Sequence, residues 1–299
     1  GKVECKETRK LPISEFPITK NTEDKTGSVV VWERPIADPE FGMYYASIDP
    51  VSEGKTTTSE SLCSIYIYKN PIEVTRIKHG ETETFIERDK IVAAWCGRFD
   101  DLNKTHERLE MMIEWYNAWT IVENNISTFI KHMIDKKKQR FLVPKSQIMF
   151  LKDLGSNNNV FQEYGWRNTG TLFRNHMLSY LIEYLNEELD TVVKDDGTIV
   201  KTVYGVERIP DIMAMKEMQA YTDDLNVDRL VALSSLIAFA KVQQANRGYK
   251  KKVERLTDNK LQKQENLFKL NNGGMFRHMG KRPSLQSAYK SRSPFKNIK

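Results

Sequence analysis

The sequence predicts an α/β fold in which a mixed β-sheet is flanked by helices, with an auxiliary β-hairpin. Two neighbouring apolar runs, at residues 43–49 and 62–68, contain the aromatic and β-branched residues that favour strands. Later segments carry apolar residues at spacings of three and four, which predict amphipathic helices. The order of three strands, then helix, strand, helix and strand, indicates an antiparallel meander that leads into parallel strands.

Apolar runs rich in β-branched and aromatic residues mark a short strand at residues 28–35 and then the three strands of the meander, which are residues 43–49, residues 62–68 and a third region in two pieces, 73–78 and 91–96. Pro35 closes the first of them, because proline cannot donate to a strand ladder. Gly42 and Pro50 bound the second, which is the buried central strand. The polar insert at residues 79–90 is expected to be a loop or a hairpin tip.

Apolar stripes mark the expected helices, which cover residues 105–119, 126–134, 172–189 and 210–221 and a last segment that starts at residue 228. Thr105 is the expected N-cap of the first helix, and Trp119 is the last residue of its stripe. Short apolar runs at residues 120–125 and 140–144 are expected to be further strands of the sheet. Two β-branched runs around an Asp-Gly turn predict a β-hairpin at residues 191–204.

Composition divides the chain into three segments. Residues 1–28 are polar and irregular, residues 29–250 form the expected globular domain, and residues 251–299 form a basic tail. The net charge is +6, and residues 257–299 hold ten Lys and Arg against two acidic residues. Such a tail suits contact with a polyanion, and a solvated end is an equally supported alternative. Because few of its side chains are large and apolar, we expect it to be disordered without a partner.

The chain has three cysteines, Cys5, Cys63 and Cys96, which are too few and too scattered for a disulfide framework or a zinc site. The last two lie in apolar runs and are expected to be small core residues in a reducing compartment. No apolar run approaches the roughly 18 residues of a membrane span, and no signal peptide is recognisable. Because the chain opens with Gly1 rather than methionine, we expect it to be a fragment of a longer protein.

Three carboxylates lie at element boundaries rather than on solvated helix faces. Asp49 ends the central strand, Glu123 ends a later strand, and Asp228 opens the last helix. Each one alone is more simply a turn residue or a helix cap. Together they match the needs of phosphodiester hydrolysis, in which two cations about 3.5–4 Å apart activate a water and stabilise the leaving oxygen. Because Mg²⁺ prefers carboxylate oxygens, the three residues predict a site for two Mg²⁺ or Mn²⁺ ions.

The run Gly-Lys-Thr at residues 54–56 resembles the end of a phosphate-binding loop. The full pattern requires glycine at the position that Asp49 occupies. We therefore reject an ATP site and expect Gly54 to give the loop flexibility beside the metal ions.

Four segments, taken in order, resemble the C-terminal nuclease domain of the large terminase subunit of tailed bacteriophages, within the RNase H-like and RuvC-like superfamily. Tyr-Ala-Ser-Ile-Asp-Pro at residues 45–50 is similar to the first motif of this family, and Ile-Val-Glu-Asn-Asn at residues 121–125 to the second. Gly-Trp-Arg-Asn-Thr at residues 165–169 resembles the segment before its long helix. Asp-Arg-Leu-Val-Ala-Leu at residues 228–233 resembles its third motif.

The resemblance implies an endonuclease that cuts concatemeric double-stranded viral DNA at the start and end of genome packaging. Asp49 would bridge both metal ions, and Glu123 and Asp228 would complete one each. Cutting would be largely independent of sequence, through contacts of Lys and Arg with the DNA backbone. The expected DNA-binding residues are Lys55, Arg167, Lys194, Lys201, Lys250, Lys251 and Lys252. The implied partners are the portal and the small terminase subunit, and the implied location is the cytoplasm of the host cell.

The sequence departs from the pattern of the family at two points. Residues 226–228 read Asn-Val-Asp where the family tends to have His-Asp-Asp, so we expect the last residue of this run to be the ligand. Asp224 or Asp223 could replace the missing flanking ligand. The loop after the central strand also lacks an acidic residue that is common in the family, and Glu53 or Glu60 could compensate. The ATPase motor of the family is absent from this chain.

Other hypotheses remain open. A Holliday-junction resolvase or a transposase of the same fold is a second enzyme class. Ribonuclease H itself is disfavoured, because its second acidic residue sits on a helix whereas Glu123 follows a strand. A non-catalytic DNA-binding or assembly module could also keep the fold alone.

Overall fold

The structure, a computed structural model, describes residues 27–54, 61–78, 81–148, 163–167, 171–193, 199–222, 227–246 and 250–256. The chain divides into two compact units, the first made of residues 1–75 and 84–252 and the second of residues 76–83 and 253–299. The central sheet and the candidate site belong to the first unit. The predicted boundaries after residues 28 and 250 stay a prediction, and the tail from residue 257 onward lies outside the described residues.

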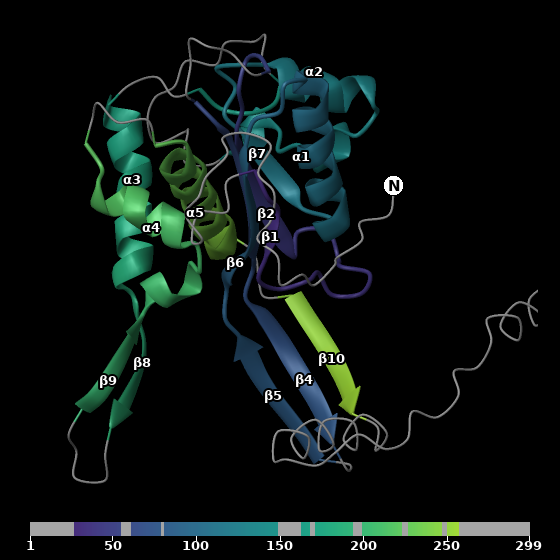
Figure 1. The fold of residues 1–299 in the computed structure, drawn as a ribbon. Helices are drawn as coiled ribbons and strands as arrows, with labels where there is room; N and C mark the ends of the chain where they lie inside the picture. Colours follow the sequence, from purple (N-terminus) through teal and green to yellow (C-terminus); the bar gives the residue numbers. More distant parts are fainter. Residues whose placement is uncertain are drawn as a thin grey trace, which may run out of the picture. The chain divides into compact units, whose positions relative to one another are not determined.

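The central sheet has five strands in the order β1-β6-β3-β2-β7 (Figure 1). Its strands are β1 (Val30–Val31), β2 (Tyr44–Asp49), β3 (Cys63–Lys69), β6 (Lys90–Gly97) and β7 (Trp119–Val122). From β1 to β2 the neighbours are antiparallel, and β7 runs parallel to β2. The predicted mixed α/β sheet is therefore confirmed, and so is its step from an antiparallel meander to a parallel strand.

Helices cover both faces of this sheet (Figure 1). On one face, α1 (Leu102–Tyr116) and α2 (Thr128–Asp135) share a buried apolar cluster with the strands. On the other face, a second cluster contains residues of α3 (Thr171–Asn186), α4 (Ile212–Gln219) and α5 (Asp228–Asn246). No described helix is both long enough and apolar enough to span a membrane.

The alternation of side chains along β2 decides which helix each of them meets. Its even-numbered residues belong to the cluster formed with α1 and α2. Tyr45 instead packs edge-on against Phe239 of α5, with ring centroids 5.0 Å apart. The hydroxyls of Ser47 and Ser235, both buried, are hydrogen-bonded at 2.6 Å. Since positions 45, 47 and 49 share one face, the last residue of β2 faces the layer that contains α5.

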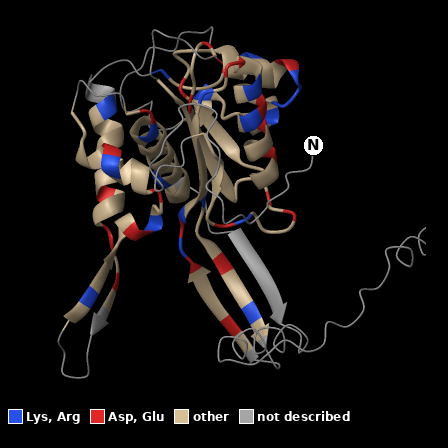
Figure 2. Cartoon of the chain, viewed as in Figure 1, with Lys and Arg blue, Asp and Glu red and all other residues tan. Residues whose placement is uncertain are grey.

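Charged residues are rare within the central sheet and frequent on the surrounding helices (Figure 2). The five strands contain only Asp49, Lys69 and Lys90, each at the end of a strand. The Lys69 ammonium is buried and pairs with Glu33 at 2.6 Å and with Glu87 at 2.7 Å. Asp49 is thus the one acidic residue that these strands carry.

The remaining strands are β4 (Ile72–Lys78), β5 (Glu81–Glu87), β8 (Glu188–Val193), β9 (Ile199–Tyr204) and β10 (Lys250–Leu256). β8 and β9 form the predicted antiparallel hairpin, and β10, β4 and β5 form a sheet in that order. Short 3-10 helices are η1 (Gln139–Phe141), η2 (Lys145–Gln147) and η4 (Gly205–Arg208).

Two predictions about α1 are wrong. Its N-cap is Asp101 rather than Thr105, and the Asp101 carboxylate accepts a hydrogen bond from the Asn103 amide at 2.9 Å. The helix starts earlier because this acidic residue satisfies an amide of the first turn. Asn117, with a left-handed φ of 48°, ends it before Trp119, which belongs to β7 instead.

Three other expected boundaries also differ. The strand expected at residues 140–144 is replaced by the end of η1 and by two isolated bridges, Leu142 with Thr120 in parallel and Pro144 with Tyr164 antiparallel. The insert at residues 79–90 contains the whole of β5, and its last residue begins β6. The helix expected at residues 172–189 ends at Asn186, so Leu189 lies in β8, and Ile182, which was expected in its apolar stripe, is 58% exposed. In a short apolar run, periodicity alone does not distinguish a strand from a helical segment.

Candidate functional site

Asp49 lies at the end of β2, which is the fourth of the five strands and not the central one expected from the sequence. It pairs with Ser64 of β3 as the last residue of β2, and Pro50 follows it. Because residues 45, 47 and 49 share one face of the strand, its carboxylate belongs to the face that α5 covers. The strand itself is buried on both sides, so the backbone below this carboxylate is rigidly held.

Glu123 lies beside Asp49 because β7 runs parallel to β2. Val122 pairs with Ile48, and the Glu123 amide donates to the Ile48 carbonyl oxygen at 3.0 Å. The Glu123 side chain is buried, and its Oε1 accepts a hydrogen bond from Asn125 Nδ2 at 2.6 Å. The predicted second carboxylate thus reaches the same sheet edge as the first, with its side chain oriented by a neighbouring amide.

Gly165 and Trp166 hold the backbone around Glu123. Trp166 pairs in parallel with Glu123, and its amide donates to the Val122 carbonyl oxygen at 3.0 Å. Gly165 has a φ of 78°, and a Cβ at this position would lie 2.6 Å from that same oxygen. Only glycine accepts both the dihedral angle and the close approach.

Asp228 reaches the site because it is the first residue of α5. Its Oδ2 accepts a hydrogen bond from the amide of Leu62, at 2.7 Å. Ser235 lies about two helical turns further along α5, on the same side as Asp228, and is the residue bonded to Ser47. α5 therefore starts at the edge of the sheet where β2 ends.

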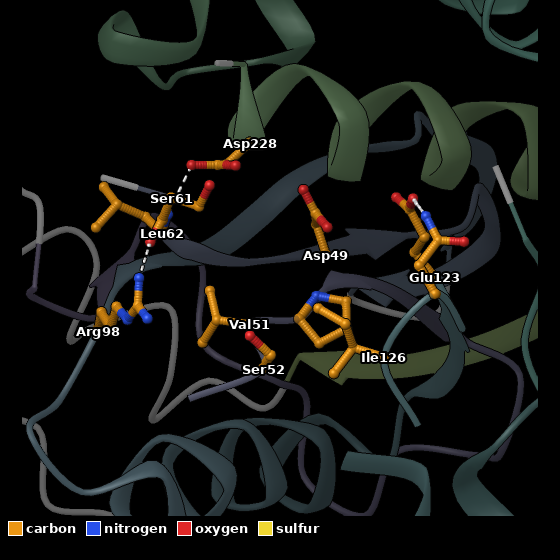
Figure 3. A pocket seen from close by; sticks show the side chains of 11 residues that line it. Asp49, Val51, Ser52, Ser61, Leu62, Arg98, Glu123, Ile126 and Asp228 are labelled. Carbon is orange, nitrogen blue, oxygen red and sulfur yellow. Dashed lines mark hydrogen bonds between the residues drawn. The ribbon is translucent and has the colours of Figure 1, made fainter. Parts of the chain in front are cut away.

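The three carboxylates line one cavity of about 230 Å³ (Figure 3). The other lining residues are Pro50, Val51, Ser52, Ser61, Leu62, Arg98, Asn125 and Ile126. Burial raises the pKa of Asp49 well above its ordinary value of 3.8, and the negative charges of Glu123, Asp228 and Glu217 raise it further. Negative charge is therefore concentrated at this edge of the sheet, where a bound cation would relieve the repulsion.

Arg98 lines the same cavity and was not singled out from the sequence, where an arginine after a strand carries no signal. Its side chain is 2% exposed. Its Nε donates to the carbonyl oxygen of Gly54 at 2.8 Å, and its Nη1 donates to that of Ser61 at 3.0 Å. Arg98 thus ties the segment after Asp49 to the residue that begins the approach to β3.

Gly54 has a different role from the expected one. A Cβ at Gly54 would lie 1.9 Å from the backbone oxygen of Asp100. Glycine is required at this position because the backbones at Gly54 and Asp100 lie too close together for a side chain. The expectation that Gly54 gives the loop flexibility is therefore wrong. Cys63 and Cys96 are buried and free, as expected for core residues, and burial raises the pKa of the Cys96 thiol to about 12.

The predicted DNA-binding residues are only partly described. Arg167 is exposed, and Lys201 in β9 forms an ion pair with Glu207 at 3.1 Å. Lys250, Lys251 and Lys252 lie in β10. The predicted residues outside the described part of the chain are Lys55, Lys194, Asp223 and Asp224. The assignment of all of these residues to DNA or metal binding stays a prediction.

The donor chemistry of the cavity fits a hard divalent cation. Asp49, Glu123 and Asp228 offer the carboxylate oxygens that Mg²⁺ and Mn²⁺ prefer. Within the described ranges, no group of three or more His, Cys, Asp and Glu side chains is placed to hold one metal ion as it stands. Mg²⁺ usually keeps several waters and takes one or two carboxylates, so such a compact group is not required.

Comparisons with protein-family models, with curated proteins and with solved structures gave no match. The functional assignment therefore depends on the residues and on their geometry.

Proposed function

We propose that this chain is a metal-dependent endonuclease of the RNase H-like type, which cuts double-stranded viral DNA during genome packaging as the nuclease domain of a terminase large subunit. One observation carries the proposal. Asp49, Glu123 and Asp228 are far apart in the sequence and come from three different elements, yet they line a single cavity.

The sheet supports the RNase H-like part of the proposal. Strand β2 is antiparallel to β3 on one side and parallel to β7 on the other. Two of the three carboxylates follow from this pairing, because parallel neighbours end at the same edge of a sheet. The packaging role, with the portal and the small terminase subunit as partners, rests on the resemblance of the sequence segments.

The electrostatics of the cavity favour an enzyme over a non-catalytic DNA-binding or assembly module of the same fold. The burial of Asp49 and, after it, the like charges beside it raise the pKa of this carboxyl and cost stability. Costly groupings of titratable residues occur preferentially at functional sites. Divalent cations bound there would activate a water and stabilise the leaving oxygen of a phosphodiester. The protein residues would hold the cations and exclude alternative ligands through the fixed backbone around Glu123 and Asp49.

A plasmid-cleavage assay tests the proposal. The purified chain should nick or linearise supercoiled plasmid with Mg²⁺ or Mn²⁺ and lose this activity with EDTA. Glu123→Gln and Asp228→Asn should be inactive, whereas Asp135→Asn, which changes an exposed carboxylate at the end of α2, should be fully active. Full activity of the Glu123 and Asp228 variants would contradict the proposal.

Two further comparisons separate the competing hypotheses. A resolvase would cut a four-way junction in strong preference to plain duplex, whereas the packaging nuclease would cut both. Asp224→Asn tests the alternative ligand. If this variant is inactive while Asp228→Asn retains activity, the third ligand has been assigned to the wrong residue.

A further inference from the structure

The start of α5 is capped by a side chain from α4. A helix leaves its first amides without partners, and the residue before α5 is Val227, whose side chain cannot accept a hydrogen bond. Glu217 supplies the acceptor instead. Its Oε2 accepts from the amides of Arg229 at 3.1 Å and Leu230 at 3.3 Å. These are the two residues that directly follow Asp228.

The capping carboxylate is itself held firmly. Glu217 Oε1 accepts from Arg229 Nη1 at 2.6 Å, and the side chains of this pair are only 19% and 8% exposed, respectively. The helix that carries Glu217 is anchored by Asp211, whose carboxylate accepts from the Met213 amide at 2.9 Å and from the Tyr66 hydroxyl at 2.5 Å. A chain of polar contacts therefore runs from β3 through α4 to the start of α5.

We propose that Glu217 is a positioning residue for the Asp228 carboxylate, an inference that rests on the proposed function. By fixing two successive amides after Asp228, Glu217 fixes the backbone from which that side chain projects. The bonds to Glu217 also keep the amides of Arg229 and Leu230 from binding the Asp228 carboxylate. With the cap absent, those amides would be free to donate to the carboxylate of Asp228, the residue directly before them, and would draw it away from the cavity.

The cap and the charge of Glu217 can be separated by a pair of variants. Glu217→Ala removes both, whereas Glu217→Gln removes the charge and keeps an oxygen that can accept from the amides. Both leave Arg229 without its charged partner at Glu217. A difference between the two variants therefore reports the cap together with the side-chain volume that alanine removes, and the Met variant described below restores that volume without an acceptor.

The experiment measures Mn²⁺ binding to the full chain by titration calorimetry, so that its result does not depend on cleavage. We expect Glu217→Ala to bind Mn²⁺ roughly 10-fold or more weakly than Glu217→Gln, within the range found for residues that orient metal ligands. The control is Asp101→Ala, which removes the N-cap of α1 and should lower the melting temperature without changing Mn²⁺ affinity. Equal affinities of the Ala and Gln variants would overturn the positioning role.

If Glu217→Ala does not fold, a double variant provides another way to remove the cap. Glu217→Met with Arg229→Met removes the buried charge pair as well as the cap, and apolar replacements of buried pairs are often tolerated. It should bind Mn²⁺ as weakly as expected for the Ala variant, and wild-type affinity would overturn the inference. If the wild-type chain itself binds no Mn²⁺, the proposed function fails and this inference fails with it. Wild-type binding with no loss in the cap variants removes the inference alone.

Discussion

Arg98 and Asp228 hold opposite ends of one peptide group. Arg98 Nη1 donates to the Ser61 carbonyl oxygen at 3.0 Å, and the amide of the next residue, Leu62, donates to Asp228 Oδ2 at 2.7 Å (Figure 3). Hydrogen bonds in such a series polarise one another, so the guanidinium strengthens the donor that faces the carboxylate. Arg98 therefore acts on Asp228 through this shared peptide.

Arg98→Lys should weaken both the fold and the site. A lysine ammonium cannot reproduce the fork that reaches the carbonyl oxygens of Gly54 and Ser61 together. We expect the free energy of unfolding to fall by about 1–3 kcal/mol, the cost of buried acceptors left without a donor. Urea denaturation measures this loss, and cleavage should fall with it even at temperatures where the variant is folded. If Arg98→Lys is as stable and as active as wild type, the peptide group between Ser61 and Leu62 does not depend on the Arg98 guanidinium.

Asp49→Asn should give an inactive protein that is at least as stable as wild type. The substitution keeps the size of the side chain and removes a charge that burial and the charges of Glu123 and Asp228 disfavour. We expect the free energy of unfolding in EDTA to rise by about 1–2 kcal/mol as the repulsion is relieved, within the range of single stabilising substitutions. Plasmid cleavage and urea denaturation check the two halves of the prediction. A clear loss of stability would mean that the carboxylate supports the fold rather than chemistry.

His106 should make the protein sensitive to mild acid. Burial, aided by His132 and opposed by Asp101, lowers the pKa of this buried side chain from 6.5 to about 4. Below pH about 6.5, His106 is protonated in the unfolded chain but stays neutral in the folded protein until the pH approaches 4. The contribution of this group to the free energy of unfolding is therefore fully present above pH about 6.5 and is lost as the pH falls towards 4. Between pH 7 and pH 5 the loss from this group is about 2 kcal/mol.

His106→Leu removes this titration and tests the prediction. The variant also removes a buried Nε2 that has no hydrogen-bond partner. Its free energy of unfolding should depend less on pH than that of wild type between pH 7 and pH 5, since the remaining titratable groups are shared. Parallel curves for the two proteins would show that this histidine is protonated equally in the folded and unfolded states.

Gly165→Ala should displace the backbone that supports Glu123. The new Cβ would lie 2.6 Å from the Val122 carbonyl oxygen, and a φ of 78° is strained for alanine. We expect a loss of about 1–3 kcal/mol in the free energy of unfolding and weaker Mn²⁺ binding, because the clash displaces the backbone next to Glu123. Glu163→Ala, at an exposed position in the same segment, is the control and should change neither. Unaltered Mn²⁺ affinity in Gly165→Ala would show that the bridge to Trp166 does not position Glu123.

The three carboxylates could be found from the sequence because each stands where a local pattern changes. Asp49 and Glu123 end apolar runs, and Asp228 opens a helical stripe, so position alone distinguishes them from solvated charges. Arg98 and Glu217 could not be found in this way. Their roles depend on contacts with residues 37 and 12 or 13 positions away, respectively, and no local pattern reports those contacts.

The wrong predictions have local causes. Thr105 and Asp101 are both acceptable N-caps, and only the observed hydrogen bond to Asn103 distinguishes them. Within the run at residues 140–144, Phe141, Leu142 and Val143 are buried, but η1 and isolated bridges to Thr120 and Tyr164 take the place of the expected strand.

The hydrogen bond between Ser47 and Ser235 joins residues 188 positions apart, and this separation has a consequence for the newly made protein. A ribosome releases β2 and β7 long before it releases α5, because chains are synthesised from the N-terminus. During that interval Asp49 and Glu123 can meet at the sheet edge, but Asp228 has not been made. Under the proposed function, a nascent or truncated chain without α5 would lack the third carboxylate, and DNA cleavage would arise only once translation has passed this helix.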